Sequence, residues 1–271
     1  MLRLIDASKT FHPGTVHEKH ALEHVNLTIP DGDFVTIIGS NGAGKSTLFN
    51  AVAGSFLLDE GFIELDGRDI TFEKEHDRSR YIGRLFQDPM MGTAPNMTIE
   101  ENLSVAFLRA SEPKKSIFSR VSKEEHKMFR ERLSLLKMDL ENRMDTPVGL
   151  LSGGQRQALT LLMATVVTPK LLLLDEHTAA LDPATAEKVL ALTKEIIEEK
   201  KISCLMVTHN MQQALTLGNR TLMMADGRIV LDVSGQERAA MQVEDLLRRF
   251  AENAGKALDN DRILLSGREG N

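Results

Sequence analysis

The chain has little of two things that mark common classes of protein: cysteine and an excess of positive charge. Its 271 residues contain one cysteine, Cys204, so an internal disulfide framework is excluded. Cys204 lies in the apolar run from Ile202 to Val207, which predicts a small buried side chain rather than a reactive thiol. The 33 Lys and Arg residues against 39 Asp and Glu residues give a formal net charge of −6. Such a balance provides no broad basic surface for phosphate backbones, and nucleic acid is not expected as a partner.

Long apolar runs are missing as well. The longest, at residues 158–167 and 171–174, are well short of the ~20 apolar residues that a transmembrane helix needs. The N-terminus does not show a basic region followed by an apolar stretch, the pattern of a secretory signal. We therefore expect a cytoplasmic chain that spans no membrane by itself.

The hydrophobic pattern predicts an α/β fold. Residues 2–11 and 21–29 alternate apolar and polar residues, as half-buried antiparallel strands near a sheet edge do. Residues 171–174 and 204–207 are continuously apolar, and residues 34–38 are apolar apart from Thr36, which is typical of central strands in a parallel sheet. The sequence thus indicates a doubly wound core with an antiparallel β subdomain.

Residues 93–150 have a helical pattern and are predicted to form an inserted subdomain. One helix is expected over residues 98–109. A second opens at Ser122, where Glu125 completes a capping box, and is expected to run to about Met138. Outside this subdomain we predict a solvated loop at 113–116, a hairpin at Asp226-Gly227, a helix at 243–254 and an uninterpreted tail at 259–271.

The strongest local signal is a glycine-rich segment between the apolar strand at 34–38 and a helical run at 48–54. It consists of Gly39, Ser40, Asn41, Gly42, Ala43, Gly44, Lys45, Ser46 and Thr47. This order of strand, loop and helix is what a P-loop requires, because backbone N–H groups and a helix N-terminus then converge on phosphates. Lys45 would reach the β- and γ-phosphates, and Ser46 would ligate Mg²⁺. A P-loop alone fits kinases and GTPases as well as ATPases.

Two carboxylates follow the apolar strand at 171–174, at the strand end where ligands of open α/β sheets bind. Asp175 suits the coordination of Mg²⁺. Glu176 can polarise the water that attacks a γ-phosphate. Strands ending in Asp-Glu are common by chance, so the significance of this pair comes from the P-loop in the same chain.

A second helix N-terminus suited to an anion is found just before the apolar run at 158–167. Its residues follow Leu151 and are Ser152, Gly153, Gly154 and Gln155. With the P-loop and the paired carboxylates, this segment resembles the signature of the ABC ATPase family. The resemblance implies that the segment binds the γ-phosphate of an ATP held by another copy of the chain. Two ATP molecules would then be sandwiched in a head-to-tail dimer.

Four further positions match the family in order. The resemblance implies that Phe11 stacks on adenine, Gln87 contacts Mg²⁺ and the attacking water, Asp182 reaches the dimer interface, and His209 contacts the γ-phosphate. Other roles stay open: an apolar edge for Phe11, a polar strand end for Gln87, and a structural part for His209. Asp182 also precedes Pro183, as a helix N-cap does.

His177 is a departure, because many members of the family carry proline there. We expect it to face the surface without a catalytic part, although an imidazole beside Glu176 could also shift that carboxylate's pKa. The other histidines show no helical pairing with acids that would indicate a metal site, so Mg²⁺ is the only metal expected.

The resemblance also implies an organisation and an output. A P-loop NTPase core of the RecA type, with its β subdomain, would comprise residues 1–92 and 151–235, the helical subdomain 93–150, and the C-terminal helix and tail 236–271. Long inserted coiled coils and a second core, typical of chromosome-packing and translation members, are not seen. This favours a subunit on the inner face of the cell membrane that drives a separate permease. The helical subdomain and the segment after Gln87 would form its docking groove.

The segments at 86–98 and 175–182 resemble a bacterial importer subgroup of tryptophan/tyrosine uptake ATPases, which act with an extracytoplasmic binding protein. Uptake of an amino acid or a similar small solute is therefore expected. Two alternatives stay open at this point: an exporter motor, and an ABC protein that serves as a scaffold or assembly factor without a permease.

Overall fold

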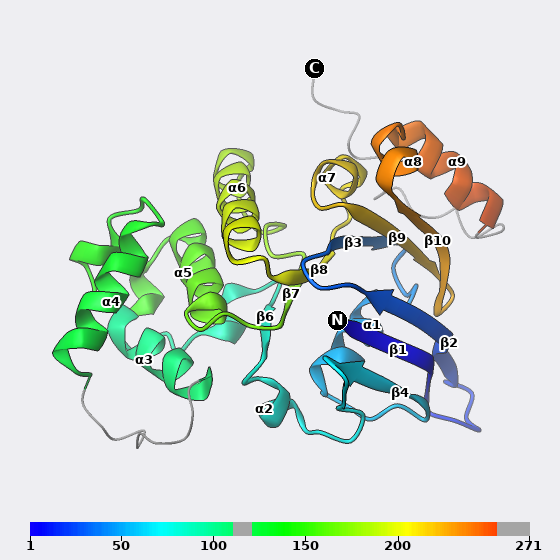
Figure 1. Ribbon diagram of the computed structural model, residues 1–271, viewed down its shortest axis with the longest axis horizontal. Coiled ribbons are helices and arrows are strands. Elements are labelled where there is room, and N and C mark those ends of the chain that lie inside the picture. Colours follow the sequence, from blue (N-terminus) through cyan, green and yellow to red (C-terminus); the bar gives the residue numbers. More distant parts are fainter. Residues whose placement is uncertain (111–120, 254–271) are drawn as a thin grey trace. The chain divides into compact units, whose positions relative to one another are not determined.

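The computed structural model describes residues 1–110 and 121–253. The predicted loop at 113–116 and the tail at 259–271 lie outside these residues. The chain divides into two compact units, one made of Met1–Arg78 with Ser203–Asn271 and the other of Ser79–Ile202. Figure 1 labels the helices and strands of the two units.

The first unit contains a four-stranded antiparallel sheet with the order β2-β1-β4-β5. Its strands are β1 (Leu2–Phe11), β2 (Lys19–Ile29), β4 (Glu60–Leu65) and β5 (Arg68–Asp69). Toward the end of β2, buried apolar side chains alternate with exposed polar ones, as the sequence predicts. β2 is an edge strand, as predicted, whereas β1 pairs with β2 on one side and with β4 on the other.

The same unit holds a second set of strands in the order β10-β9-β3-β8. They are β3 (Phe34–Gly39), β8 (Ser203–Val207), β9 (Arg220–Ala225) and β10 (Arg228–Ser234). β3 is parallel to both β8 and β9, and every residue of β3 and β8 is buried. These are the two-faced strands that continuous apolar runs predict, and Cys204 is buried within β8 as expected.

The predicted hairpin at Asp226-Gly227 joins β9 to β10, which are antiparallel. Both turn residues have positive φ, 46° at Asp226 and 73° at Gly227. A two-residue turn of this kind matches the twist of the strands it connects, which is why Asp-Gly signals it.

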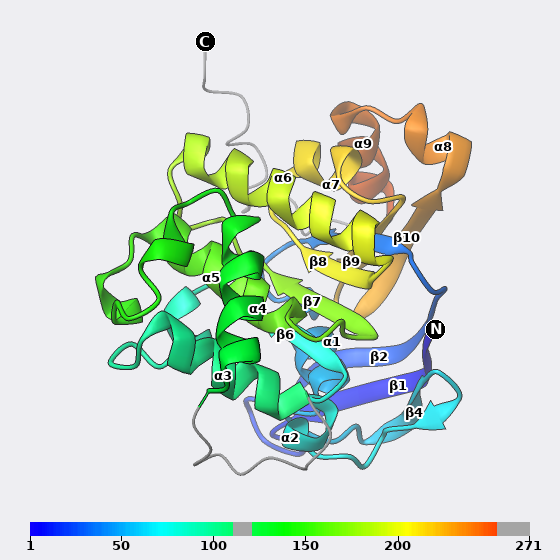
Figure 2. The same ribbon diagram turned by 60° about the vertical axis from the view of Figure 1, so that its left-hand side comes forward.

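Helices of the first unit are α1 (Lys45–Ala53), α2 (Glu75–Arg78), α7 (Met211–Thr216), α8 (Gly235–Ala239) and α9 (Val243–Asn253). An apolar cluster with Met211, Met223, Leu246 and Phe250 packs α7 and α9 against β9. Figure 2 shows this C-terminal group of helices beside the strands. The predicted C-terminal helix is therefore present.

The second unit contains two parallel strands, β6 (Ile82–Leu85) and β7 (Leu171–Asp175), and most of the helices. The helices are η1 (Pro89–Gly92), α3 (Ile99–Ala110), α4 (Lys123–Ser134), η2 (Leu140–Asn142), η3 (Val148–Leu150), α5 (Gly153–Thr165) and α6 (Pro183–Lys200). Among the described residues of the chain, none of the helices combines the length and apolarity needed to cross a membrane.

The helix predicted from the Ser122 capping box begins as expected. The Ser122 hydroxyl accepts from the Glu125 N–H, and the Glu125 carboxylate accepts from the Ser122 N–H. The prediction that it runs to about Met138 is wrong, because α4 ends at Ser134. Tight turns follow, and Lys137 takes the left-handed conformation with φ 54°, which a helix cannot continue through.

Candidate functional site

The glycine-rich loop of the first unit is shaped by backbone that leaves no room for side chains. A Cβ built on Gly39, where φ is 151°, would lie 2.3 Å from the Met224 carbonyl oxygen. At Gly44, where φ is 102°, it would lie 2.6 Å from the Ala21 carbonyl oxygen. Glycine is therefore required at both positions, and the loop folds closely onto the strands around it.

Lys45 is the first residue of α1 and is buried, with 6% of its surface exposed. Its Nζ donates to the carbonyls of Gly39 and Ser40 at 2.7 and 2.8 Å, which holds the ammonium group over the loop. The N-cap residue of α1, Gly44, supplies no side-chain acceptor to the helix. Backbone N–H groups at a helix start, a cation and a glycine concavity together fit a polyphosphate, and the exposed Ser46 hydroxyl is a hard oxygen ligand that suits Mg²⁺.

His209 follows β8, at the same edge of the strands as the glycine loop. β3 and β8 run parallel with Ile37 opposite Val207, and the Thr208 N–H continues the pairing by donating to the Ile37 carbonyl at 3.1 Å. Parallel strands end at one edge, which is where open α/β sheets bind ligands. The first unit thus brings His209 and the loop to one side, as their sequence positions predict.

Phe11 lies at the end of β1 and is partly exposed. Its ring meets that of Phe56 edge to face, with centroids 5.4 Å apart, and the Lys9 ammonium lies 5.8 Å from its centroid. The apolar-edge role is therefore visible in the structure. Stacking on adenine stays a prediction.

The second unit brings three predicted residues together in the same way. β6 and β7 are parallel with Leu85 opposite Leu174, so Gln87 and the pair Asp175 and Glu176 leave the strands at one edge. Gln87 is exposed, and the two carboxylates are partly exposed. Oxygen ligands in this arrangement suit Mg²⁺, and a carboxylate with access to water suits a base.

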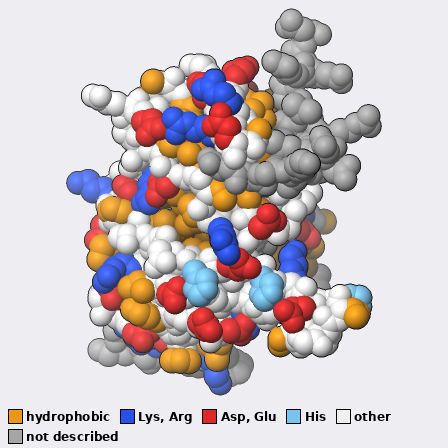
Figure 3. Space-filling model, turned by 90° about the vertical axis from the view of Figure 1, so that its right-hand side faces the viewer, with side chains coloured by type: hydrophobic (Ala, Val, Ile, Leu, Met, Phe, Trp, Pro, Cys, Tyr) orange, Lys and Arg blue, Asp and Glu red, His pale blue; other side chains and the backbone are white. Residues whose placement is uncertain are grey.

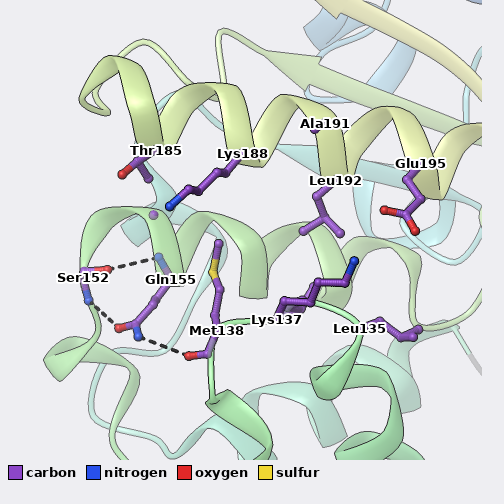
Figure 4. A pocket seen from close by; sticks show the side chains of 12 residues that line it. Leu135, Lys137, Met138, Ser152, Gln155, Thr185, Lys188, Ala191, Leu192 and Glu195 are labelled. Carbon is purple, nitrogen blue, oxygen red and sulfur yellow. Dashed lines mark hydrogen bonds between the residues drawn. The ribbon is translucent and has the colours of Figure 1, made fainter.

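The signature segment opens α5 with a second capping box. The Ser152 hydroxyl accepts from the Gln155 N–H, and Gln155 Oε1 accepts from the Ser152 N–H, each at 3.2 Å. The Gln155 amide also donates to the carbonyl of Met138 at 3.5 Å, so the segment is tied to the chain that follows α4 (Figure 4). The start of α5 is thereby held rigidly, with its remaining N–H groups available to an anion.

A cavity of about 520 Å³ lies between the start of α5, one side of α6 from Thr185 to Glu195 and the segment after α4. Ser152 and Gln155 line it together with two cationic side chains, Lys137 and Lys188 (Figure 4). Sequence reasoning did not find this cavity, because it depends on how two helices pack.

Asp182 caps α6 as predicted, with its carboxylate accepting from the Thr185 N–H at 3.0 Å and Pro183 at the first helical position. Its hydrogen bonds to Thr185 lower the pKa of the Asp182 carboxyl. The residue is exposed. The capping role is therefore established, and the interface role stays a prediction.

The expectation that His177 faces the surface is wrong. Its side chain is 1% exposed, and Nε2 lies 3.2 Å from the Thr193 hydroxyl in α6. Burial lowers the pKa of the imidazole to about 4. The physical reason lies in the preceding residue: Glu176 has φ 45°, so the chain turns sharply where the sequence suggests a simple strand end.

One group of possible metal ligands lies elsewhere, on the antiparallel sheet of the first unit. Asp6, His24 and Glu60 come from three adjacent strands, are exposed, and have ligand atoms within 4.8 Å of one another. Figure 3 shows histidine side chains among acidic ones on one face of the molecule. Helical spacing cannot reveal a group assembled across strands. His24 Nδ1 already pairs with Asp6 at 2.8 Å, and an exposed pair of this kind is common without a metal.

The glycine loop, the buried Lys45 above it and the open helix start define a P-loop nucleotide-binding protein. Within that class, a family model described as ABC transporter matches residues 22–179, more than half of the chain, and the chain belongs to this family. It is an ABC ATPase that binds ATP and hydrolyses it to ADP and phosphate.

Three relatives illustrate the similarity. A tyrosine transport ATP-binding protein of Clostridioides difficile is 45% identical over 253 residues, 92% of this chain and 98% of its own. A dimeric post-hydrolysis structure of the ATP-binding cassette MJ0796, bound to ADP and Pi, superimposes with a TM-score of 0.74 at 29% identity, covering 86% of this chain and 98% of that one. The structure of CbiO1 from Clostridium perfringens, part of the ABC transporter complex cbiONQ, superimposes with a TM-score of 0.74 at 26% identity. The match covers 93% of this chain and 94% of that one.

Proposed function

We propose that the chain drives bacterial uptake of an amino acid, with tyrosine as the first candidate, through a separate membrane permease. The observation that carries the proposal is the 45% identity to a tyrosine transport ATP-binding protein over nearly the full length of both chains. The ATPase would not contact the amino acid. An extracytoplasmic binding protein and the permease would select it.

Each predicted site residue has a role in the ATP hydrolysis that we propose. The glycine loop and Lys45 hold the phosphates of ATP, and His209 contacts the γ-phosphate. Ser46, Gln87 and Asp175 would ligate Mg²⁺, whose positive charge would offset the charge of the phosphates. Glu176 accepts a proton from the attacking water or orients it.

The signature segment from Ser152 to Gln155 has no part in binding the chain's own ATP in this scheme. We propose that its helix start contacts the γ-phosphate held by a second copy, with Asp182 at the interface, so that two copies enclose two ATP molecules. The dimeric ADP-bound structure of MJ0796 supports this assignment.

The permease would dock at the helical subdomain, residues 93–150, and at the segment after Gln87. Large apolar side chains are exposed in this part of the described chain: Met91 is 70% exposed, Val105 55% and Leu150 72%. Where such residues gather into one contiguous patch, the patch is typical of an interaction surface. Docking there would place the chain on the inner face of the cell membrane.

The test is transport in proteoliposomes that contain the chain and a candidate amino-acid permease, with ATP inside and a candidate binding protein outside. Labelled tyrosine should accumulate only with Mg-ATP, and Lys45→Ala should abolish accumulation while the permease remains assembled. Competition by other amino acids then defines the substrate range. Accumulation without ATP, ATP-driven efflux, or unchanged transport with Lys45→Ala would contradict the proposal.

A further inference from the structure

The hydrogen bonds of Thr193 place a proton on one ring nitrogen of the histidine next to the proposed base. The Thr193 hydroxyl in α6 donates its hydrogen to the Val189 carbonyl at 2.7 Å. Thr193 Oγ1 can therefore only accept from His177 Nε2, which lies 3.2 Å away. Nε2 therefore carries a proton and donates it to the Thr193 hydroxyl.

The imidazole is not explained by packing. Its Nδ1 is buried and has no hydrogen-bond partner among the described residues. An unsatisfied buried acceptor costs free energy that an apolar side chain of similar volume, such as leucine, would not. The one thing that leucine could not supply at position 177 is the hydrogen bond to Thr193.

The backbone conformation of Glu176, the residue before His177, has to be held in place by neighbouring contacts. Glu176 has φ 45°, a left-handed backbone that is unfavourable for a residue with a Cβ and persists only where neighbouring contacts impose it. The Ala179 N–H donates to the Glu176 carbonyl at 2.9 Å, and the Leu181 N–H donates to the Thr178 carbonyl at 3.2 Å. The ring of His177 adds an anchor outside the turn, in the middle of α6.

Helix α6 connects this anchor to the proposed dimer interface. It begins directly after Asp182, whose carboxylate caps it through the Thr185 N–H at 3.0 Å. The chain between Glu176 and Asp182 is thus tied to α6 at its end by the cap and near its start by His177. A displacement of α6 must therefore move the backbone next to Glu176.

We propose that His177 is a positioning residue, which holds the turn at Glu176 in register with α6 through Thr193 and so lets contacts of Asp182 with a second copy set the orientation of the base. The inference rests on the proposed roles of Glu176 and Asp182. It gives His177 no contact with nucleotide or water.

The test uses two matched pairs of variants in the full chain. His177→Leu and Thr193→Val remove the hydrogen bond at nearly constant volume, whereas His177→Gln and Thr193→Ser keep a donor or an acceptor. The first two should lower kcat about 10- to 100-fold, the range expected for a misplaced catalytic group, and leave KM within about twofold. The second two should stay near the wild-type rate. The double variant His177→Leu/Thr193→Val should be no slower than either single variant, because both remove one link.

A readout without nucleotide separates positioning from activity. Hydrogen exchange at the Ala179 and Leu181 amides should be faster in His177→Leu and Thr193→Val than in their matched partners. In a Glu176→Gln background, both variants should still form the ATP-driven dimer, because the link acts on the base and not on nucleotide binding.

Several outcomes would overturn the inference. A wild-type kcat in folded His177→Leu or Thr193→Val would contradict the inference. An equally large fall in kcat in His177→Gln, which keeps a donor, would also contradict it. If His177→Leu does not fold, the isosteric Thr193→Val decides. Glu176→Gln separates failure of the proposed base from failure of the positioning role. If Glu176→Gln retains turnover, the proposed base is wrong. If Glu176→Gln abolishes turnover and Thr193→Val has the wild-type rate, only the positioning role of His177 fails.

Discussion

The methyl group of Thr185 in α6 occupies the space that any side chain on Gly154 in α5 would need. A Cβ built on Gly154 would lie 2.2 Å from Thr185 Cγ2, and Gly154 itself is buried. Atoms in packed proteins do not approach this closely, so either the Thr185 side chain would have to leave its rotamer or one helix would have to move. Glycine at position 154 is therefore required by the contact between the starts of two helices, independently of any contact with ATP.

Gly154→Ala should lower the free energy of unfolding by about 1–3 kcal/mol, the usual cost of overpacking. Adding Thr185→Ser removes Cγ2 but keeps the N–H that Asp182 caps, and should restore most of the loss. Urea unfolding followed by circular dichroism measures both. Gly92→Ala is the control, because its Cβ would make only an ordinary contact at 3.5 Å. Failure of Thr185→Ser to rescue would show that the clash is not the cause.

Lys45→Ala should weaken ATP binding about 10- to 150-fold. The ammonium is held over the glycine loop by two backbone carbonyls, and a hydrogen bond to a charged group contributes ~1.5–3 kcal/mol. Equilibrium titration with a fluorescent ATP analogue measures the affinity. Lys194→Ala, on the exposed face of α6, is the control and should bind normally. Wild-type affinity in Lys45→Ala would remove Lys45 from its assigned role.

Glu176→Gln should bind Mg-ATP, hydrolyse it at least ~100-fold more slowly, and accumulate as a dimer, because the amide cannot take a proton from water. Size-exclusion chromatography with light scattering, with and without Mg-ATP, measures the shift from monomer to dimer. No shift would mean that the signature segment does not act on ATP held by a second copy, at least in the isolated subunit.

The same experiment tests the signature when Ser152 is changed in the Glu176→Gln background. Ser152→Ala removes only the cap on the Gln155 N–H and should weaken the dimer modestly. Ser152→Arg places a large side chain at the exposed start of α5 and should prevent the dimer while ATP binding to the monomer persists. A normal dimer with Ser152→Arg would contradict the sandwich arrangement.

Features with local chemistry could be predicted from the sequence. The caps at Ser122 and Asp182 and the turn at Asp226-Gly227 depend on residues within a few positions of one another. The buried strand β3 follows from a continuous apolar run. The P-loop segment combines both kinds of signal, so its position between a strand and a helix could also be predicted.

Features that depend on tertiary packing could not be predicted from the sequence. His177 and Thr193 are 16 residues apart, and no pattern in the sequence pairs them. The left-handed conformation of Lys137, which fixes where the chain leaves α4, carries no glycine or asparagine signal. Arg78 is 1% exposed because four backbone carbonyls, among them those of Ala51 and Val52, accept from its guanidinium. From residue type alone, an arginine is expected at the surface, so the burial of Arg78 could not be predicted.

The buried imidazole of His177 should make stability depend on pH below neutrality. Its pKa falls from 6.5 to about 4 on folding, so between these values the unfolded chain binds a proton that the folded chain does not. The free energy of unfolding therefore decreases as the pH falls from about 7 to about 4, and this group adds almost no pH dependence above about 7.5. The full difference corresponds to about 3 kcal/mol, of which about 2 kcal/mol is lost between pH 7 and pH 5.

Urea unfolding of the wild type and His177→Gln at pH 5, 6, 7 and 8 isolates this contribution, because glutamine does not titrate. The two stability curves should be parallel from pH 7 to 8, and between pH 7 and 5 the wild type should lose about 2 kcal/mol more than the variant. His76→Gln, which replaces a histidine with a 72% exposed side chain, is the control and should follow the wild type. Parallel curves for the wild type and His177→Gln down to pH 5 would show that the imidazole accepts a proton in the folded chain as readily as in the unfolded one.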